Sequence, residues 1–265
     1  MLLQLADYYP LIFLAPFLVL ALVWGARRYA TPRHWRLRAL AVSLAAFGVS
    51  IGVGLAWARF LPDWTLVDGA ALGTWGGALA GILAYEFLHY WYHRAAHTWN
   101  WLWRAGHQMH HSAEALDAFG AYYGHPLDTL FFTSWAVLAF YPLLGLTPEA
   151  GAIAAAFLAF NAAFQHANIR TPRWLGFLVQ RPESHAVHHG RGIHHWNYSD
   201  LPLWDMLFGT LRNPQRGAEP REVGFYNGAS TRIAEMLAFR DVSSARGRGR
   251  QLRAVDDSRF SAGCP

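Results

Sequence analysis

The sequence predicts an all-α fold: an integral membrane helical bundle of about four to five spans with a cytoplasmic histidine-rich helical cap. Three observations support this prediction. Apolar residues make up 54% of the 265 residues, and the mean hydropathy is +0.12, which is unusually apolar for a soluble domain of this length. Several long apolar runs carry no charged side chain, and most of the 14 histidines gather in short segments between or after those runs.

Each uncharged run is long enough to form a membrane helix. The runs comprise residues 11–26, 39–57, 69–85, 129–148 and 150–169. Tyr8, Tyr9 and Trp24 flank the first run, where interfacial aromatics lie in membrane helices, and no basic residue precedes it, so we expect a retained anchor. Only a short turn separates the last two runs, which predicts a helical hairpin.

The arginines predict how the bundle is oriented. All 22 basic residues are arginines, and five of them lie between the first two runs: Arg27, Arg28, Arg33, Arg36 and Arg38. Because short cytoplasmic loops carry the excess of basic residues, this loop is expected in the cytoplasm and the N-terminus outside. Alternate crossings then bring every histidine-rich segment to the cytoplasmic side of an inner (plasma) membrane.

The composition also divides the chain and excludes some partners. We predict anchor helices over residues 1–85, a histidine-rich catalytic domain over 86–212 that includes the membrane hairpin 129–169, and a polar, partly disordered tail over 213–265. The formal charge of +5 is not concentrated on one soluble face, so nucleic-acid binding is not expected. The single cysteine, Cys264, excludes a disulfide framework and any site that needs several thiolates from this chain.

The histidine spacing indicates metal binding. His93 and His97 are four residues apart, and the pattern HxxHH occurs twice, at His107, His110 and His111 and at His185, His188 and His189. Positions i, i+3 and i+4 of a helix share one face, so each segment presents two or three imidazoles together. Eight such ligands are more than one ion can take, so two metal ions are the economical interpretation.

Other metal and cofactor motifs are missing from the sequence. There is no HExxH segment of a zinc protease, and one ExxH segment, Glu86 to His89, is too few for a four-helix di-iron carboxylate site. Two further interpretations remain open: a membrane zinc- or copper-binding or transport protein, and a bis-histidine haem electron carrier.

Longer segments around these histidines resemble the fatty acid hydroxylase and sterol desaturase superfamily. They are Glu86-Phe-Leu-His-Tyr-Trp-Tyr-His-Arg-Ala-Ala-His97, Leu102-Trp-Arg-Ala-Gly-His-Gln-Met-His-His-Ser112, His125-Pro126, Gln165-His-Ala-Asn168, Pro182-Glu-Ser-His-Ala-Val-His-His189, Asn197-Tyr198 and Leu203-Trp-Asp-Met-Leu-Phe-Gly-Thr210. The resemblance covers about residues 86 to 211, nearly half of the chain. Before residue 86 the chain is similar only in having apolar helices.

The resemblance implies a helical membrane enzyme with two non-haem iron ions that uses O2 to hydroxylate or desaturate a lipid C–H bond. It implies that the catalytic, metal-binding residues are His93, His97, His107, His110, His111, His185, His188 and His189. His166 is expected as a further ligand, and His125 as either a ligand or a residue that hydrogen-bonds to one. The sequence departs from the family's pattern at His89, His194 and His195, whose roles stay open.

The implied reaction requires electrons from another protein. The chain has neither the cysteines for an iron–sulfur cluster nor a recognisable haem or flavin domain, so we expect an external ferredoxin or cytochrome donor. Arginines available to dock an acidic donor are Arg104, Arg173, Arg181 and Arg191. The expected partners are therefore a lipid substrate, the bilayer and this donor.

Overall fold

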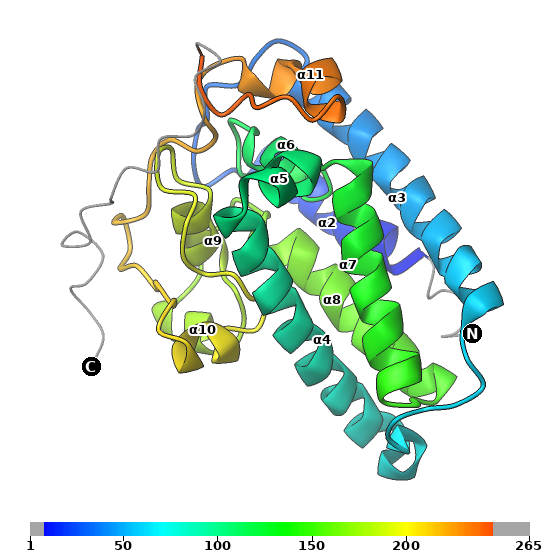
Figure 1. Cartoon of the computed structure of the whole chain (residues 1–265). Coiled ribbons are helices and arrows are strands. Elements are labelled where there is room, and N and C mark those ends of the chain that lie inside the picture. Colours follow the sequence, from blue (N-terminus) through cyan, green and yellow to red (C-terminus); the bar gives the residue numbers. More distant parts are fainter. Residues whose placement is uncertain (1–7, 246–265) are drawn as a thin grey trace.

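Five principal helices and a cap of shorter ones make up the fold (Figure 1). The structure is a computed structural model that describes residues 8–245, and within them the only β-structure is an isolated bridge between Gly190 and Val223. The principal helices are α2 (Tyr9–Val23), α3 (Trp35–Phe60), α4 (Gly73–Thr98), α7 (Pro126–Leu138) and α8 (Pro148–Gln165). A 3-10 turn (Gly69–Leu72) precedes α4, and a π-helical turn (Ala139–Leu143) continues α7.

Consecutive principal helices run in alternating directions, as the sequence predicts. Hydrogen bonds fix both ends of the bundle: the Ala26 amide donates to the Asn168 carbonyl where α2 and α8 end, and the Gly69 amide donates to the Leu144 carbonyl at the opposite end. Between these ends, Ser50 on α3 is hydrogen-bonded to Thr133 on α7. The segments that follow α4 and α8 therefore lie at the same end of the molecule.

Short capping signals explain where the hairpin helices begin. The Thr147 side chain accepts a hydrogen bond from the Ala150 amide, Pro148 occupies the first turn of α8, and Glu149 places a negative charge near the positive end of the helix dipole. At α7 the cap is His125, whose Nδ1 accepts from the Leu127 amide ahead of Pro126. These contacts set the position at which each helix leaves or enters the cap.

Two helical segments of the described chain are long and apolar enough to cross a membrane: Trp35–Phe60 and Gly69–Thr98. The first predicted run forms α2, which has 15 residues and is shorter than a typical span. The predicted hairpin forms α7 with its π-helical continuation and α8, and polar side chains such as Gln165 lower the apolar character of α8. The predicted helices are thus present, whereas two segments rather than four or five meet the length and composition criterion.

The cap lies at the end where α4 and α8 terminate (Figure 1). It contains α5 (Asn100–Leu102), a π-helical turn (Trp103–His107), α6 (Gln108–His111), α9 (Pro182–His188), α10 (Leu203–Leu207) and α11 (Ile233–Leu237). The segment 213–245 differs from the predicted polar tail, because Met236 and Val242 are fully buried against the cap and the Tyr123 hydroxyl donates to the Ser230 carbonyl. The rest of that predicted tail, residues 246–265, lies outside the described part of the chain.

Close packing between α4 and the end of the hairpin helix α7 yields a stability prediction. A Cβ added at Gly81 would lie 2.7 Å from Leu146 Cδ1 and 3.3 Å from Phe140 Cδ1, whereas one added at Gly48 on α3 would meet nothing within 4 Å. We expect Gly81→Val to destabilise the protein by about 1–3 kcal/mol relative to the matched Gly48→Val variant, because overpacking displaces buried side chains. Thermal unfolding in detergent, followed by circular dichroism, checks this; equal midpoints would contradict the packing described here.

Candidate metal centre

Three short segments supply the histidines of the centre. His93 and His97 lie on the last turns of α4. The second pattern runs from the end of the π-helical turn Trp103–His107 into α6, and the third lies on α9 and on His189, which directly follows it. π-helical turns are rare and occur often at functional sites. His166 follows the last residue of α8 directly, so the bundle brings it to the same end.

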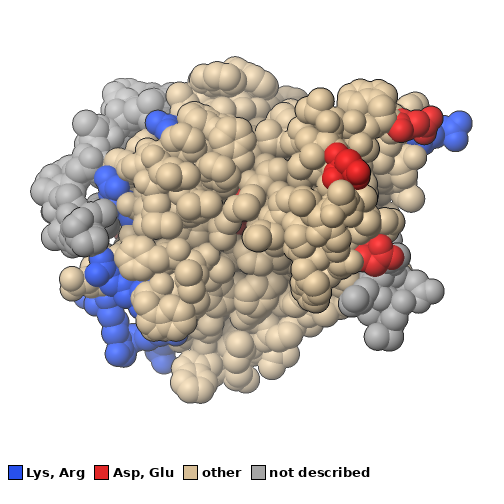
Figure 2. All heavy atoms as spheres, turned by 90° about the horizontal axis from the view of Figure 1, so that it is seen from below, with Lys and Arg blue, Asp and Glu red and all other residues tan. Residues whose placement is uncertain are grey.

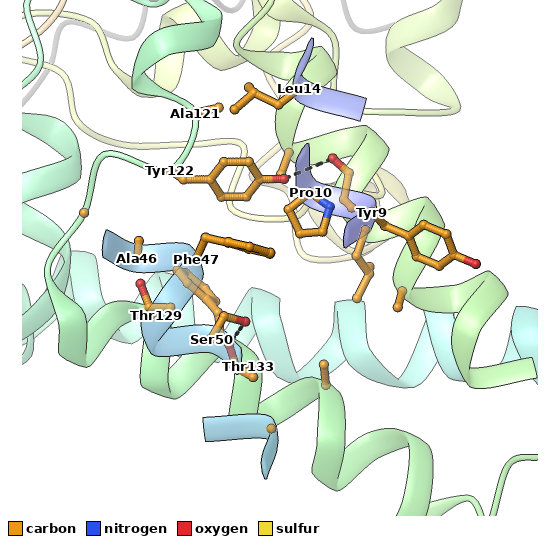
Figure 3. Close-up of a pocket in the computed structure, with 18 of the residues that line it drawn as sticks. Tyr9, Pro10, Leu14, Ala46, Phe47, Ser50, Ala121, Tyr122, Thr129 and Thr133 are labelled. Carbon is orange, nitrogen blue, oxygen red and sulfur yellow. Dashed lines mark hydrogen bonds between the residues drawn. The ribbon is translucent and has the colours of Figure 1, made fainter. Parts of the chain in front are cut away.

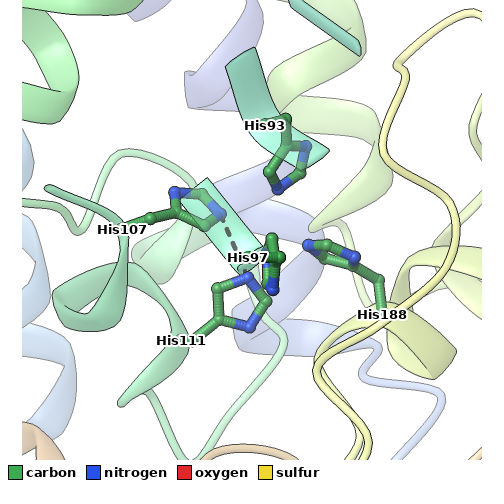
Figure 4. A group of neighbouring side chains, drawn as sticks. All are labelled: His93, His97, His107, His111 and His188. Atoms are coloured by element: carbon green, nitrogen blue, oxygen red, sulfur yellow. Dashed lines mark hydrogen bonds between the residues drawn. The ribbon is translucent and has the colours of Figure 1, made fainter. Parts of the chain in front are cut away.

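Nine histidines converge in two neighbouring groups. The first histidine group is His93, His97, His107, His111 and His188, and the second histidine group is His110, His166, His185 and His189. Within each group one nitrogen from every ring lies within 4.8 Å of the others. Figure 4 shows the five rings of the first group pointing toward one shared space. The groups adjoin, since the rings of His111 and His189 stack with centroids 4.2 Å apart.

Each HxxHH segment contributes to both groups. From the second segment His107 and His111 enter the first group and His110 enters the second, while from the third segment His188 enters the first group and His185 and His189 enter the second. Residues four apart share a helix face, and the remaining histidine projects from a different angle on the same turn. The two segments thereby hold the two groups at a fixed separation.

Hydrogen bonds fix which nitrogen of several rings faces the interior. His93 Nδ1 lies 2.7 Å from the Tyr198 carbonyl, and His188 Nδ1 lies 2.6 Å from the Trp196 carbonyl. A carbonyl only accepts, so each Nδ1 carries the hydrogen and each Nε2 retains its lone pair. The Nε2 atoms of both rings are buried and form no hydrogen bond with the protein. Such nitrogens are ready to bind a metal ion.

Distances between facing nitrogens also fit a shared ion. His107 Nε2 and His111 Nε2 are 3.1 Å apart in the first group, and His166 Nε2 and His185 Nε2 are 3.2 Å apart in the second. Two imidazoles bound to one ion at about 2.0–2.1 Å have their nitrogens roughly 2.8–3.4 Å apart at right-angle to tetrahedral geometry. Imidazole is a common ligand of iron, zinc and copper, so the donor set fits one metal ion in each group.

The loop after α9 orients two of these rings. Trp196 and Asn197 have positive φ angles of 69° and 52°, a backbone conformation that is strained for tryptophan and that asparagine adopts more readily. The Asn197 side chain stabilises the loop by donating to the Ser184 and Arg212 carbonyls and accepting from the Arg212 amide. The strained loop directs the Trp196 carbonyl to His188, and the Tyr198 carbonyl to His93. Backbone carbonyls perform this role, so among the sequence signals only the Asn197-Tyr198 pair of the family resemblance pointed to it.

Burial keeps the rings of the cap uncharged. Loss of hydration, followed by the proximity of other histidines, lowers the pKa of His111, His185, His188 and His189 well below the usual 6.5, and His110 responds in the same way. Neutral imidazole is the form that binds metal. These five rings are therefore in the protonation state that metal binding requires at neutral pH.

Acidification is accordingly expected to destabilise the metal-free protein. The lowered pKa values mean that the unfolded chain binds more protons than the folded one once the pH falls below about 6.5. The free energy of unfolding should then decrease with falling pH, by up to about 1.4 kcal/mol per pH unit for each ring that stays neutral in the fold. Unfolding of the chelator-treated protein between about pH 7.5 and about pH 5.5 checks the sign; a flat profile would contradict it.

Other predicted residues lie outside the two groups. His125 caps α7 and packs against the Phe239 ring with centroids 5.2 Å apart, so the structure does not bring it to either group. His194 is hydrogen-bonded to His111, and His195 to the Tyr198 hydroxyl. Among the carboxylates, Asp128 binds a histidine of the first group, with its Oδ2 2.7 Å from His107 Nδ1.

A cavity of about 930 Å³ extends from the histidines into the bundle. Its lower part is lined mainly by apolar side chains of α2, α3, α7 and α8, and Figure 3 shows Leu14, Phe47 and Tyr122 around this space. Its upper part reaches both groups at His93, His107, His110, His166 and His185. The cavity therefore connects an apolar interior with the metal-binding nitrogens.

Known proteins share the sequence of this region. A family model described as fatty acid hydroxylase matches residues 78–210, which is half of the chain. Human alkylglycerol monooxygenase is 34% identical over 58% of this chain and 36% of its own length. Ornithine lipid hydroxylase OlsE of Rhizobium tropici is 33% identical over 51% of this chain and 42% of its own length. Sphinganine C4-monooxygenase 1 of Arabidopsis thaliana is 23% identical over 58% of this chain and 60% of its own length.

The family model covers the same part of the chain as the histidine groups. The chain spans about a third to three fifths of the length of these relatives. No solved structure matches the chain. The family match begins on α4, ends after α10, and contains all nine converging histidines. The chain belongs to the fatty acid hydroxylase family.

Proposed function

We propose that this chain is a membrane-bound non-haem di-iron oxidoreductase that uses O2 to oxidise a C–H bond of a lipid. The observation that carries the proposal is the pair of adjoining histidine groups that a largely apolar cavity reaches. Hydroxylation is favoured over desaturation, because relatives are named as monooxygenases or hydroxylases of alkylglycerol, ornithine lipid and sphinganine.

We propose the nine histidines as the iron ligands. The first histidine group would hold one iron ion and the second histidine group the other, since each offers at least four nitrogens within bonding reach of a common point. When bound, the iron ions supply the activation of O2 and the oxidation of the C–H bond. His125 is not proposed as a ligand, because it lies in neither histidine group and its Nδ1 accepts the helix-cap hydrogen bond, which leaves the ring hydrogen on Nε2.

The protein's own contribution is to bind the substrate and keep the site dry. The cavity walls hold an apolar chain by burial of its surface and direct one end of it toward His93 and His107. Burial of the surrounding rings excludes bulk water, which protects a reactive centre from competing reactions. The Tyr198 and Trp196 carbonyls keep two of the ligand rings in a fixed orientation.

Exposed apolar side chains support a place in the membrane. Only 17% of the most apolar 18-residue stretch of α3 is buried, and Leu37 and Phe60 on this helix are exposed without lining the cavity. A core helix of a soluble protein would be covered, so bilayer lipid is the fitting surrounding. In Figure 2, uncharged side chains cover most of the surface seen from below, with acidic side chains and one basic group toward one edge and further basic side chains along the opposite edge.

We propose that the histidine groups face the cytoplasm at an inner (plasma) membrane. The loop between α2 and α3 lies at the same end as the cap and carries Arg27, Arg28 and Arg33, whereas the opposite end carries Asp63 and Asp68 beside Arg59. Positive loops stay in the cytoplasm. Protease cleavage, or labelling of cysteines introduced at each of the two ends, in intact cells tests this orientation. Labelling of the cap from outside the cell would contradict it.

An external protein is proposed as the electron donor, of the ferredoxin or cytochrome type. The iron centre itself holds no continuing supply of electrons, and the only thiol of this chain is Cys264. Turnover by the purified enzyme should require such a donor or a chemical reductant. Repeated turnover with lipid and O2 alone would contradict the proposal.

Isotope labelling tests the function directly. Cells with and without this chain are grown under ¹⁸O₂, and their lipids are compared by mass spectrometry. We expect a lipid that gains one labelled oxygen only when the chain is present, and about two iron ions per purified chain. A labelled product in neither culture, or full loading with zinc or copper and no iron, would overturn the proposal.

A further inference from the structure

A third group of buried ionisable side chains lies beside the histidine groups. Glu86, His89 and Asp200 have ligand atoms within 4.8 Å of one another and are 0%, 6% and 8% exposed. His89 precedes His93 by one turn of α4, and their rings stack with centroids 5.4 Å apart. We name this group, together with Gln165, the polar corner. None of its members belongs to the two histidine groups.

The polar corner has more acceptors than donors. Glu86 Oε2 accepts from the Ser199 hydroxyl and from the Asp200 and Leu201 amides, but the buried Glu86 Oε1 has no hydrogen-bond partner. His89 Nδ1 is 3.7 Å from Glu86 Oε2, too far for a hydrogen bond. Asp200 Oδ1 accepts from Gln165 Nε2, whereas the buried Gln165 Oε1 has no partner. The polar corner therefore contains two buried oxygens, Glu86 Oε1 and Gln165 Oε1, that accept no hydrogen bond.

Its charge is also poorly balanced. Over residues 8–245 neither Glu86 nor Asp200 forms a salt bridge with an arginine, and His89 is the only basic side chain within salt-bridge distance of Glu86. These two buried carboxylates have one histidine near them and, among the same residues, no arginine. Burial and the charge of Glu86 raise the pKa of Asp200 to about 7, and the negative charge that the pair retains at neutral pH repels an anion brought into the same space. A ligand that donates hydrogen bonds, or that carries a positive charge, would satisfy both the acceptors and the charge.

The cavity gives a ligand access to this group. His89, Asp200 and Gln165 line it together with His93, His107 and His166. An apolar chain held in the lower cavity would thus place a polar group against the polar corner, one helical turn from the metal ligand His93. The polar corner is therefore positioned to contact a polar group of the substrate close to the carbon that is oxidised.

We propose that the polar corner binds a hydrogen-bond-donating head group of the lipid, a hydroxyl or an amine, and excludes carboxylate and phosphate heads. This inference rests on the proposed function in one respect, that the cavity holds a lipid chain. It assigns Asp200 and His89 as specificity-determining residues, a role distinct from binding iron.

Binding of matched probes tests the proposal. Iron-loaded protein in detergent is titrated with hexadecanol, hexadecylamine, hexadecanoate and hexadecane, each displacing a fluorescent hexadecyl probe. A hydrogen bond to a charged group makes us expect the alcohol and the amine to bind at least about tenfold more tightly than hexadecanoate. Hexadecane reports on the apolar part of the cavity alone.

Two variants locate the preference. Asp200→Asn keeps an oxygen that accepts from Gln165 but removes the charge, and should reduce the preference for the amine over hexadecanoate at least about fivefold while leaving hexadecane binding unchanged. Asp68→Asn, at an exposed carboxylate of the opposite end, is the matched control and should change nothing. His89→Phe retains ring contacts with Tyr85 and Phe132. Relative to the unmodified protein, it should increase the preference for the amine over hexadecanoate.

Three outcomes would overturn the inference. They are equal binding of all four probes, an unchanged preference in both Asp200→Asn and His89→Phe, and a third metal ion per chain that disappears in Asp200→Asn while probe selectivity persists. Failure of the proposed function gives a different pattern: head-group selectivity would remain while no labelled oxygen enters a lipid. Labelled product without head-group selectivity would retain the function and reject the inference.

Discussion

Replacing His188 by alanine is expected to reduce the iron content from about two ions to about one per chain and to lower lipid oxidation by more than about 100-fold. The His188 ring is fully buried, with centroid distances of 4.6 Å to His93, 4.7 Å to His97 and 4.6 Å to His111. Its loss removes one donor from the first histidine group and leaves a cavity that water can enter. Elemental analysis of the purified protein and a lipid turnover assay measure the two effects.

The companion variant and the control separate metal binding from folding. His185→Ala should produce the same loss from the second histidine group. His125→Asn changes a buried histidine outside both groups, and asparagine preserves the helix cap, so iron content and turnover should be retained. A His188→Ala protein with two tightly bound iron ions, or a His125→Asn protein that loses one, would contradict the ligand assignment.

Sequence spacing was sufficient to find the histidines but not to distribute them. The repeats of i, i+3 and i+4 predict shared helix faces, and the structure brings all eight of those side chains together, with His166 added from the end of α8. The assignment of His110 to one group and His111 to the other depends on how α6 and α9 face each other. That angle is set by tertiary packing, for which local spacing carries no signal.

The fold shows the same division between local and tertiary information. Apolar runs predicted the principal helices and their alternating directions, since both follow from hydropathy and from the loops. The packing of residues 213–245 was not predicted, because it relies on isolated apolar side chains such as Met236 and Val242 and on polar contacts of Gln108. A few buried residues in a polar segment give no periodic pattern.

Replacing Asp128 by asparagine should weaken iron binding in the first histidine group by about 10–100-fold. Asp128 accepts two hydrogen bonds, from the Tyr92 hydroxyl at Oδ1 (2.8 Å) and from His107 Nδ1–H at Oδ2 (2.7 Å). Asparagine offers only one acceptor, so one of these donors would face an amide NH2 group. If the amide faces His107, the ring loses the partner that holds its Nε2 toward the metal. Iron titration of the chelator-treated variant, beside the unmodified protein, gives the change in affinity.

A second substitution should restore most of this loss. In Tyr92→Phe/Asp128→Asn the competing hydroxyl is gone, so the asparagine oxygen is free to accept from His107, and iron affinity should recover at least about threefold relative to Asp128→Asn alone. Tyr92→Phe alone should retain iron, with a cost of about 1 kcal/mol in unfolding free energy. A purely structural role for Asp128 predicts the opposite order, in which the double variant is worse than either single one. That order would show that Asp128 supports the helix packing and does not orient the ligand.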